Sequence, residues 1–398
     1  MPLPLTIAMD ARWIFSSLSG IGRYTLELAR ALIQLDTPHR FILLFDQPEL
    51  AERHGSALGL QDGSRAMSCL FPHGLFSPAS QLLLPRTLRS LGVDVYHSTN
   101  YMMPLICSAP PARIVTIHDL IPLLFRDHAP RSKKNRLFPV YRQLMHTIAR
   151  KADAIIAVSD ATRRDLIANL QAAADRIHVT AEGVDPRYCP APAHPTRGNP
   201  PLILYVGRCD PYKNVPLLIE AFAGLRAMGV AARLRIIGPE DSRYPEARAT
   251  AIRLGIEAEV QWDGYVTEEE LVRAYQEASA FVLPSRYEGF GLPVLEAMAC
   301  GTPVLCSNTS SLPEVGGEAA IYLDPLTAEN LKKQLAELLS SPDVWLRRSE
   351  QGIAHAARFT WTETARKTIA VYEQIGFGVP GRAGRDASPY QYNKTNGR

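Results

Sequence analysis

Short apolar runs alternate with amphipathic stretches along almost the whole chain of 398 residues. The apolar runs lie at 5–9, 41–45, 93–96, 114–117, 154–158 and 177–180, and then at 202–206, 234–237, 260–262, 280–283, 303–306 and 321–323. In one stretch between two runs, Tyr24, Leu28 and Ala31 recur at the spacing of a single helical face. Strands that alternate with helices predict an α/β fold with parallel sheets.

A proline-rich segment interrupts this alternation near the middle of the chain. Residues 186–201 read PRYCPAPAHPTRGNPP, with six prolines and no periodicity, as expected of a linker. The predicted division is an N-terminal domain at 1–188, a linker at 189–201, a C-terminal domain at 202–360, a final helix at 361–377 and a disordered tail at 378–398. We expect each domain to be a doubly wound, Rossmann-like sheet and the final helix to pack back on the first domain. Ligands of such sheets bind at the carboxyl ends of the strands, so a cleft between the domains is the expected site.

The most informative segment, residues 285–305, reads SRYEGFGLPVLEAMACGTPVL. Gly289 and Gly291 lie in a loop after a strand, and a helix is predicted between Pro293 in its first turn and Gly301 just past its end. The helix start offers free N–H groups to a phosphate, and the glycines allow close approach.

Two glutamates of this segment are candidate ligands. Glu288 would face a sugar at the loop, and Glu296 would bind both hydroxyls of a ribose. The alternative is that Glu296 is an ordinary acid of the first helical turn and that Glu288 is a solvated loop residue.

A second segment, residues 205–222, reads YVGRCDPYKNVPLLIEAF. Arg208 and Lys213 flank a turn after a predicted strand. Two cations at the end of a strand suit a diphosphate, whose departure develops negative charge. Ordinary basic residues on a solvated loop are the alternative.

A third segment, SGIGRY at residues 19–24, follows the first strand. Gly20 and Gly22 open a helix and would let the backbone approach a phosphate or a sugar. A dinucleotide fingerprint, with Asp46 as the ribose ligand, is a rival interpretation, but Thr25 occupies the position of its third glycine.

The spacing from Glu288 to Glu296, followed by A-x-A-C-G-T-P-V, resembles the signature of retaining family-four glycosyltransferases of the GT-B fold. The resemblance extends from Ile7 to about Ile375. It implies two Rossmann-like domains facing each other across a cleft. It further implies a donor site that comprises Gly20, Gly22, Arg208, Lys213, Glu288, Gly289, Phe290, Gly291 and Glu296.

The resemblance also assigns roles to these residues. It implies that Glu288 contacts the transferred sugar, that Glu296 binds the ribose, and that Arg208 and Lys213 hold the diphosphate in place of a metal. His118, in the segment VTIHDLIP, would lie against the donor sugar, although a lone histidine is often structural. With Glu288, Arg208 and Lys213, it completes the predicted catalytic set. His97 is expected either to reach an acceptor or to pack in the core.

The chemistry that follows is transfer of a hexose from a nucleoside-diphosphate sugar to a glycan or lipid-linked acceptor, with retention of anomeric configuration. The chain is similar to bacterial mannosyl- and rhamnosyltransferases of surface polysaccharide assembly, so GDP-mannose is the first donor to consider. The alternatives are an NAD-linked oxidoreductase and a non-catalytic protein that binds sugar nucleotides.

Charge and composition limit the partners, cofactors and cellular location that can be expected. A net charge of +3 gives no reason to expect a nucleic-acid partner. The six cysteines are scattered, without metal-ligand spacing, which suits a reducing compartment. The chain has neither a D-x-D pair placed like a metal site nor an apolar stretch long enough to span a bilayer. We therefore expect a cytoplasmic protein that needs no metal or other cofactor.

Basic and apolar residues are interleaved at 126–151, RDHAPRSKKNRLFPVYRQLMHTIARK. This segment is typical of an interfacial helix that contacts anionic lipids. The alternative is a solvated face on an ordinary core helix. The hypothesis is a peripheral contact with the inner face of the cell membrane.

Overall fold

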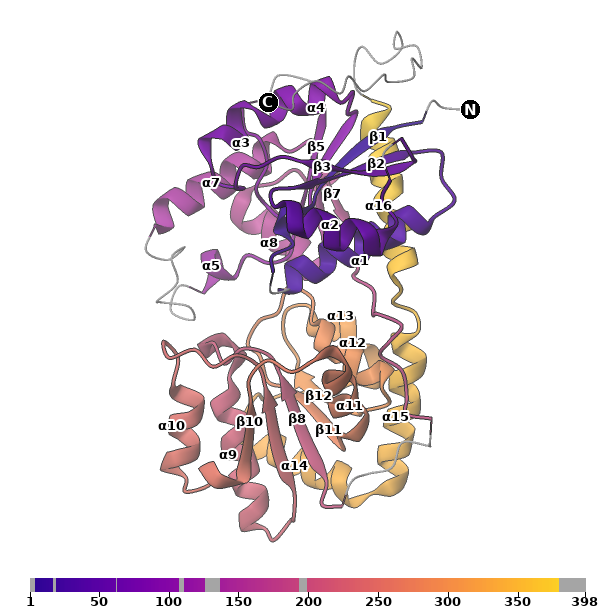
Figure 1. Ribbon diagram of the computed structural model, residues 1–398. Coiled ribbons are helices and arrows are strands. Elements are labelled where there is room, and N and C mark those ends of the chain that lie inside the picture. Colours follow the sequence, from indigo (N-terminus) through magenta and orange to yellow (C-terminus); the bar gives the residue numbers. More distant parts are fainter. Residues whose placement is uncertain are drawn as a thin grey trace.

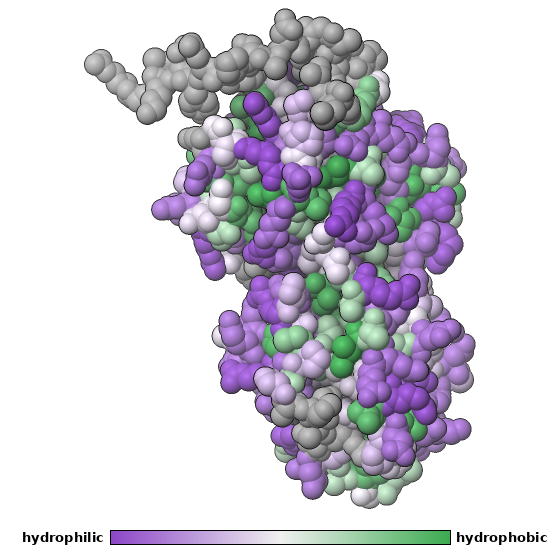
Figure 2. Space-filling view, turned by 90° about the vertical axis from the view of Figure 1, so that its right-hand side faces the viewer, coloured by the Kyte–Doolittle hydropathy of each residue, from purple (hydrophilic) through white to green (hydrophobic). Residues whose placement is uncertain are grey.

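The computed structural model describes residues 4–16, 19–61, 63–106, 111–125, 137–192 and 199–378. Two α/β domains lie end to end, and the C-terminal domain presents its strand ends to the first (Figure 1). Seen from the side, the two lobes narrow where they meet, and hydrophilic and hydrophobic residues are mixed on that face (Figure 2).

The N-terminal sheet has seven parallel strands in the order β3-β2-β1-β4-β5-β6-β7. Its strands are β1 (Thr6–Asp10), β2 (Arg40–Phe45), β3 (Ala66–Leu70), β4 (Val95–Ser98), β5 (Ala112–Ile117), β6 (Ala154–Ala157) and β7 (Ile177–Val179). Its helices are α1 (Gly20–Gln34), α2 (Pro48–Leu58), α3 (Pro78–Leu82), α4 (Leu84–Ser90), α5 (Ile121–Leu124), α7 (Phe138–Lys151) and α8 (Asp160–Leu170). The chain order reverses between β1 and β4.

The C-terminal sheet has six parallel strands in the order β10-β9-β8-β11-β12-β13. They are β8 (Leu202–Val206), β9 (Arg233–Ile237), β10 (Val260–Asp263), β11 (Ala280–Leu283), β12 (Val304–Ser307) and β13 (Ile321–Leu323). The helices are α9 (Val215–Ala227), α10 (Glu246–Arg253), α11 (Glu268–Glu277), α12 (Leu292–Ala299), α13 (Leu312–Gly316), α14 (Ala328–Ser340), α15 (Pro342–Ala356) and α16 (Trp361–Gly376). Here the order reverses between β8 and β11.

The prediction of two parallel, doubly wound sheets is confirmed, and every predicted apolar run overlaps a strand. Strand β3 was not predicted from the apolar pattern. This strand reads AMSCL, contains no β-branched residue and lies half-buried at the sheet edge, so neither composition nor alternation marks it.

The chain passes between the domains along two adjacent segments. The Val184 N–H donates to the Phe359 carbonyl (3.0 Å), and Val184 forms an isolated parallel bridge with Thr360. A Cβ on Gly183 would lie 2.2 Å from the Trp361 backbone nitrogen, so glycine is required for this approach. Helix α16 then packs against α1 of the N-terminal domain, where Figure 1 shows it rising beside that domain.

Candidate active site

The points where the two sheets reverse their strand order define where a ligand is expected to bind. In the C-terminal sheet this point lies between β8 and β11, whose following loops carry Lys213 and Glu288. In the N-terminal sheet, Gly20 and Gly22 follow β1, and His118 follows β5. The topology therefore gathers the sequence-predicted residues at strand ends.

Lys213 and Glu288 contact each other directly. The Lys213 Nζ donates to both carboxylate oxygens of Glu288, at 2.7 and 2.8 Å. Burial opposes the charge on Lys213, but the Glu288 carboxylate outweighs this effect and raises the pKa of the ammonium group. The Ser285 hydroxyl donates to Glu288 Oε1 (2.6 Å), and Glu288 is only 8% exposed. A fixed cation and a fixed carboxylate thus lie side by side.

The loop after Glu288 brings the C-terminal domain against the first domain. A Cβ on Gly289 would lie 2.1 Å from the His118 carbonyl oxygen, so glycine permits this close approach. The Ser159 hydroxyl donates to the Gly289 carbonyl across the domain junction (2.7 Å). Gly291, at φ +105°, precedes α12, as the glycine and proline pattern predicts. The Phe290 side chain is buried and packs against Phe359.

Glu296 is buried in α12 at 7% exposure. The Tyr275 hydroxyl donates to its Oε2 at 2.9 Å. Burial raises the pKa of this carboxyl, and the positive charge of Arg23 opposes that rise. Tyr275 is a residue that sequence reasoning missed, and only its place in an amphipathic helix could have indicated it.

Arg208 is separate from the Lys213–Glu288 pair. Its Nε donates to Asp210 Oδ2 (2.7 Å), and one of its terminal nitrogens donates to Asp241 Oδ2 (3.1 Å). The hydrogen bond to Asp210 raises the pKa of the guanidinium. About half of its side chain is exposed. To bind a diphosphate, Arg208 must therefore break its hydrogen bonds to Asp210 and Asp241 or use the N–H groups that these acids leave free.

His118 faces two acceptors of its own domain. Its Nδ1 lies 3.2 Å from Glu182 Oε1, and its Nε2 lies 3.0 Å from the Thr99 carbonyl oxygen. Both partners accept, so both ring nitrogens can donate only in the imidazolium. Burial opposes this charge, but Glu182 outweighs burial and raises the pKa of His118. With both nitrogens engaged, the ring is held in place, and its protonated form satisfies both acceptors.

Gly20 and Gly22 form the first turn of α1, where Gly22 N–H donates to the Ser19 hydroxyl (3.2 Å). The next residue, Arg23, extends to the C-terminal domain and forms an ion pair with Glu268. Arg23 and Glu182 were both missed by sequence reasoning. Each follows a strand on the carboxyl edge of the sheet, and that position was the available signal.

His97 belongs to the core. It is fully buried, with ring nitrogens 2.6 Å from the Tyr372 hydroxyl and 2.8 Å from the Thr116 hydroxyl. Burial lowers the pKa of His97 to about 3. The packing interpretation therefore holds, and the acceptor interpretation is wrong.

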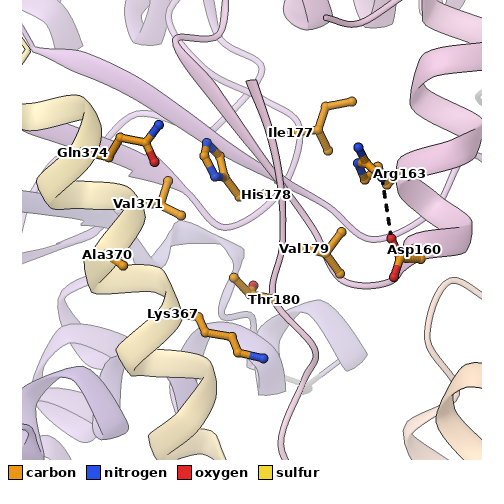
Figure 3. A pocket seen from close by; sticks show the side chains of 10 residues that line it. All are labelled: Asp160, Arg163, Ile177, His178, Val179, Thr180, Lys367, Ala370, Val371 and Gln374. Atoms are coloured by element: carbon orange, nitrogen blue, oxygen red, sulfur yellow. Dashed lines mark ion pairs between the residues drawn. The ribbon is translucent and has the colours of Figure 1, made fainter. Parts of the chain in front are cut away.

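A pocket of about 440 Å³ lies elsewhere, on the N-terminal domain between β7, α8 and α16 (Figure 3). His178, Thr180, Arg163 and Lys367 are among its lining residues, and none of the sequence-predicted site residues lines it. Its position on the outer edge of the sheet separates it from the points where strand order reverses.

Among the residues that the structure describes, no group of three or more His, Cys, Asp or Glu residues is arranged to hold a metal ion. No helix in those same ranges has the length and apolar character to cross a bilayer.

Comparison with known proteins shows the protein family to which this chain belongs. Residues 18–188 match the family described as Glycosyltransferase Family 4, and residues 191–356 match Glycosyl transferases group 1. The chain is 31% identical over 384 residues to the O-antigen chain mannosyltransferase B of Escherichia coli, covering 90% of this chain and 97% of that one.

Solved structures show the same fold. Sucrose-phosphate synthase from Thermosynechococcus elongatus has a TM-score of 0.73 at 20% identity, covering 93% of this chain and 99% of that one. Anabaena HepE, in complex with UDP and glucose, has a TM-score of 0.68 at 18% identity, covering 92% and 99%.

This chain belongs to the family-four, group 1 glycosyltransferases and has the GT-B fold. It is therefore an enzyme of the hexosyltransferase class. The NAD-linked alternative, with Asp46 as a ribose ligand, is left without support.

Proposed function

We propose that this glycosyltransferase moves mannose from GDP-mannose to a hydroxyl of a glycan or lipid-linked acceptor, with retention of anomeric configuration. The Lys213–Glu288 pair at the strand-order reversal of the C-terminal sheet is the observation that carries the proposal. The mannosyltransferase of O-antigen chains, at 31% identity, supports mannose as the sugar.

In the proposed reaction, the bond from the anomeric carbon to the β-phosphate oxygen breaks. The acceptor oxygen bonds to the same face of that carbon, and its proton passes to the departing phosphate oxygen. Such a reaction requires positioning and charge stabilisation more than a separate base. Lys213 and Arg208 would neutralise the diphosphate, Glu288 would orient the sugar, and Glu296 would bind the ribose.

His118 would act as a fixed positive charge beside the donor sugar. Its ring is held by Glu182 and Thr99, and its carbonyl lies against Gly289 of the sugar-binding loop. Gly20 and Gly22 would line the cleft from the opposite side, because Arg23 beside them already reaches the C-terminal domain.

A panel of nucleotide sugars, scored for nucleotide release with mannose-terminated acceptors, tests the donor. We expect GDP-mannose to give the highest rate, and a clear preference for another donor would overturn that assignment. A non-catalytic binding protein would show binding without turnover.

We propose that the two cations replace a divalent metal. Activity should therefore persist in EDTA, at the rate seen in its absence. Loss of activity in EDTA that magnesium or manganese restores would contradict the metal-independent mechanism.

The proposed location is cytoplasmic, with peripheral contact at the inner face of the membrane through residues 126–151. Residues 126–136 of this segment lie outside the described ranges, and α7 covers 138–151. Val140 on α7 is 65% exposed, and Leu137, which precedes the helix, is 63% exposed. Tyr141, in contrast, is buried in the core. Arg142, Arg150 and Lys151 are exposed nearby in sequence. The helix face that could contact a membrane therefore contains fewer of the apolar residues than the sequence pattern indicates.

Flotation with anionic liposomes at low and high salt tests this contact, since basic residues contribute about 1 kcal/mol each near such a surface. Lys133→Glu with Lys134→Glu, or Val140→Asp alone, should reduce binding. Ile252→Asp, at a similarly exposed position of the C-terminal domain, is the control. No flotation of the wild type at low salt would leave this segment as ordinary surface.

A further inference from the structure

A second pocket, of about 480 Å³, lies between the two domains. Its volume is within the range of small-molecule sites. Figure 1 shows α5 and α8 at the edge of the N-terminal domain that faces the C-terminal domain. The pocket is lined by Phe125, Arg164 and Asp165 on that side and by Arg286, Tyr287 and Ser310 on the other.

This interdomain pocket adjoins the proposed donor site. Tyr287 immediately precedes Glu288 in the chain, and the Glu288 N–H donates to the Ser310 hydroxyl (2.8 Å). The Arg286 N–H donates to the carbonyl of Tyr212 (2.7 Å), the residue before Lys213. A molecule in the pocket would therefore lie beside the Lys213–Glu288 pair.

The charge of the interdomain pocket is unbalanced. Arg164 and Arg286 are both exposed, and within the described ranges neither guanidinium forms a hydrogen bond or an ion pair. The one acid of the lining, Asp165, accepts a hydrogen bond from the Tyr287 hydroxyl. The rings of Phe125 and Tyr287 lie 5.2 Å apart and form an apolar wall. The charge of Arg164 also acts on Asp165, but two cations from opposite domains outnumber this one carboxylate and leave a net positive charge for an anionic ligand.

We infer that the interdomain pocket binds a phosphate group of the acceptor, an assignment that rests on the proposed transfer reaction. A guanidinium binds phosphate through paired hydrogen bonds. A phosphate has enough oxygens to engage both Arg164 and Arg286, whereas the two oxygens of a carboxylate match one guanidinium. Because each domain supplies one arginine, the acceptor phosphate also holds the domains together around the donor.

Calorimetric titration of the full chain with inorganic phosphate, at saturating GDP, tests the inference. GDP fills the diphosphate site, so phosphate bound in its presence occupies another site. We expect Arg164→Ala and Arg286→Ala each to weaken phosphate binding about tenfold or more, with partial recovery in the lysine variants. Arg163→Ala is the matched control, since Arg163 lies on the same helix, lines the other pocket and faces Asp160 at 3.9 Å. It should bind phosphate as the wild type does.

Titration with mannose 6-phosphate and with a short-chain lipid phosphate then distinguishes a soluble from a membrane-bound acceptor. Binding of either compound that is tighter than binding of inorganic phosphate supports an acceptor-phosphate site in the interdomain pocket. Equal phosphate affinity in the Arg163, Arg164 and Arg286 variants would overturn it. So would complete displacement of phosphate by GDP, or acetate binding as tight as phosphate binding. Failure of GDP itself to bind would count against the proposed donor. The phosphate titration of the free enzyme and its arginine variants would then test the interdomain pocket independently.

Discussion

The two sides of the cleft are built differently. In the C-terminal domain, the predicted residues contact one another or near neighbours, as Lys213 does with Glu288 and Tyr275 does with Glu296. In the N-terminal domain, the predicted His118 is held by Glu182 and Thr99 of its own domain. Its main link to the other side is the backbone contact with Gly289.

This difference indicates that the C-terminal domain mainly binds the donor and that the N-terminal domain mainly affects the transfer step. Donor-binding groups that lie within one domain can bind the donor before the cleft closes. Groups of the other domain affect the reaction through how closely the two domains meet. Changes on the C-terminal side should therefore affect donor binding or chemistry directly, and changes on the N-terminal side should affect transfer more than nucleotide binding.

The largest effect is expected for Glu288→Gln. The variant keeps the shape of the side chain and loses its charge beside Lys213, so turnover should fall about 100- to 1,000-fold while nucleotide affinity is spared. Initial rates of nucleotide release and GDP titration measure the two quantities. Thermal unfolding checks that the buried ammonium left behind has not unfolded the loop. Normal turnover would remove Glu288 from the site.

Glu296→Ala should instead weaken nucleotide binding. A ribose would lose two hydrogen bonds of about 1–3 kcal/mol combined, which is roughly a 5- to 150-fold higher Kd for GDP. Glu277→Ala changes an exposed acid on α11 and serves as the control. If GDP affinity is the same in both folded variants, the ribose assignment is wrong.

Arg23→Ala tests the N-terminal side. Its ion pair with Glu268 joins the domains, and both side chains are partly exposed, so we expect a transfer rate lower by about fivefold. Because the charge of Arg23 also acts on the Glu296 carboxyl, GDP affinity should fall slightly, and much less than in Glu296→Ala. Arg30→Ala, on the same helix, breaks only a local pair with Glu27. A loss of GDP affinity in Arg23→Ala as large as that in Glu296→Ala would contradict the assignment of donor binding to the C-terminal domain.

The smallest effect concerns the pH dependence of stability. The raised pKa of His118 means that its pairing with Glu182 stabilises the fold fully below the unfolded pKa of about 6.5 and that this contribution is lost as pH rises through the folded pKa. The Tm difference between the wild type and His118→Gln should therefore be largest at acid pH and shrink at alkaline pH. A difference that grows with pH would mean that His118 is neutral here.

The fold and the local geometry around Glu288 and Glu296 were predictable because the information that determines them is local. The Glu288–Glu296 spacing, the glycines and Pro293 lie within one strand-loop-helix unit, and short-range steric rules define such a unit. Arg23 and Glu182 were not predictable from local patterns, because their partners are distant in sequence. His97 lies within β4 and His118 follows the neighbouring strand β5, and the contact with Tyr372 from α16 places His97 in the core.

A double-mutant cycle on the Lys213–Glu288 pair tests the central claim most directly. Nucleotide release from GDP-mannose would be measured for the wild type, Lys213→Met, Glu288→Gln and the double variant. If the pair acts as one unit on the leaving donor, the double variant should be about as slow as the slower single variant. Rate losses that multiply in the double variant would show two independent residues and contradict the account.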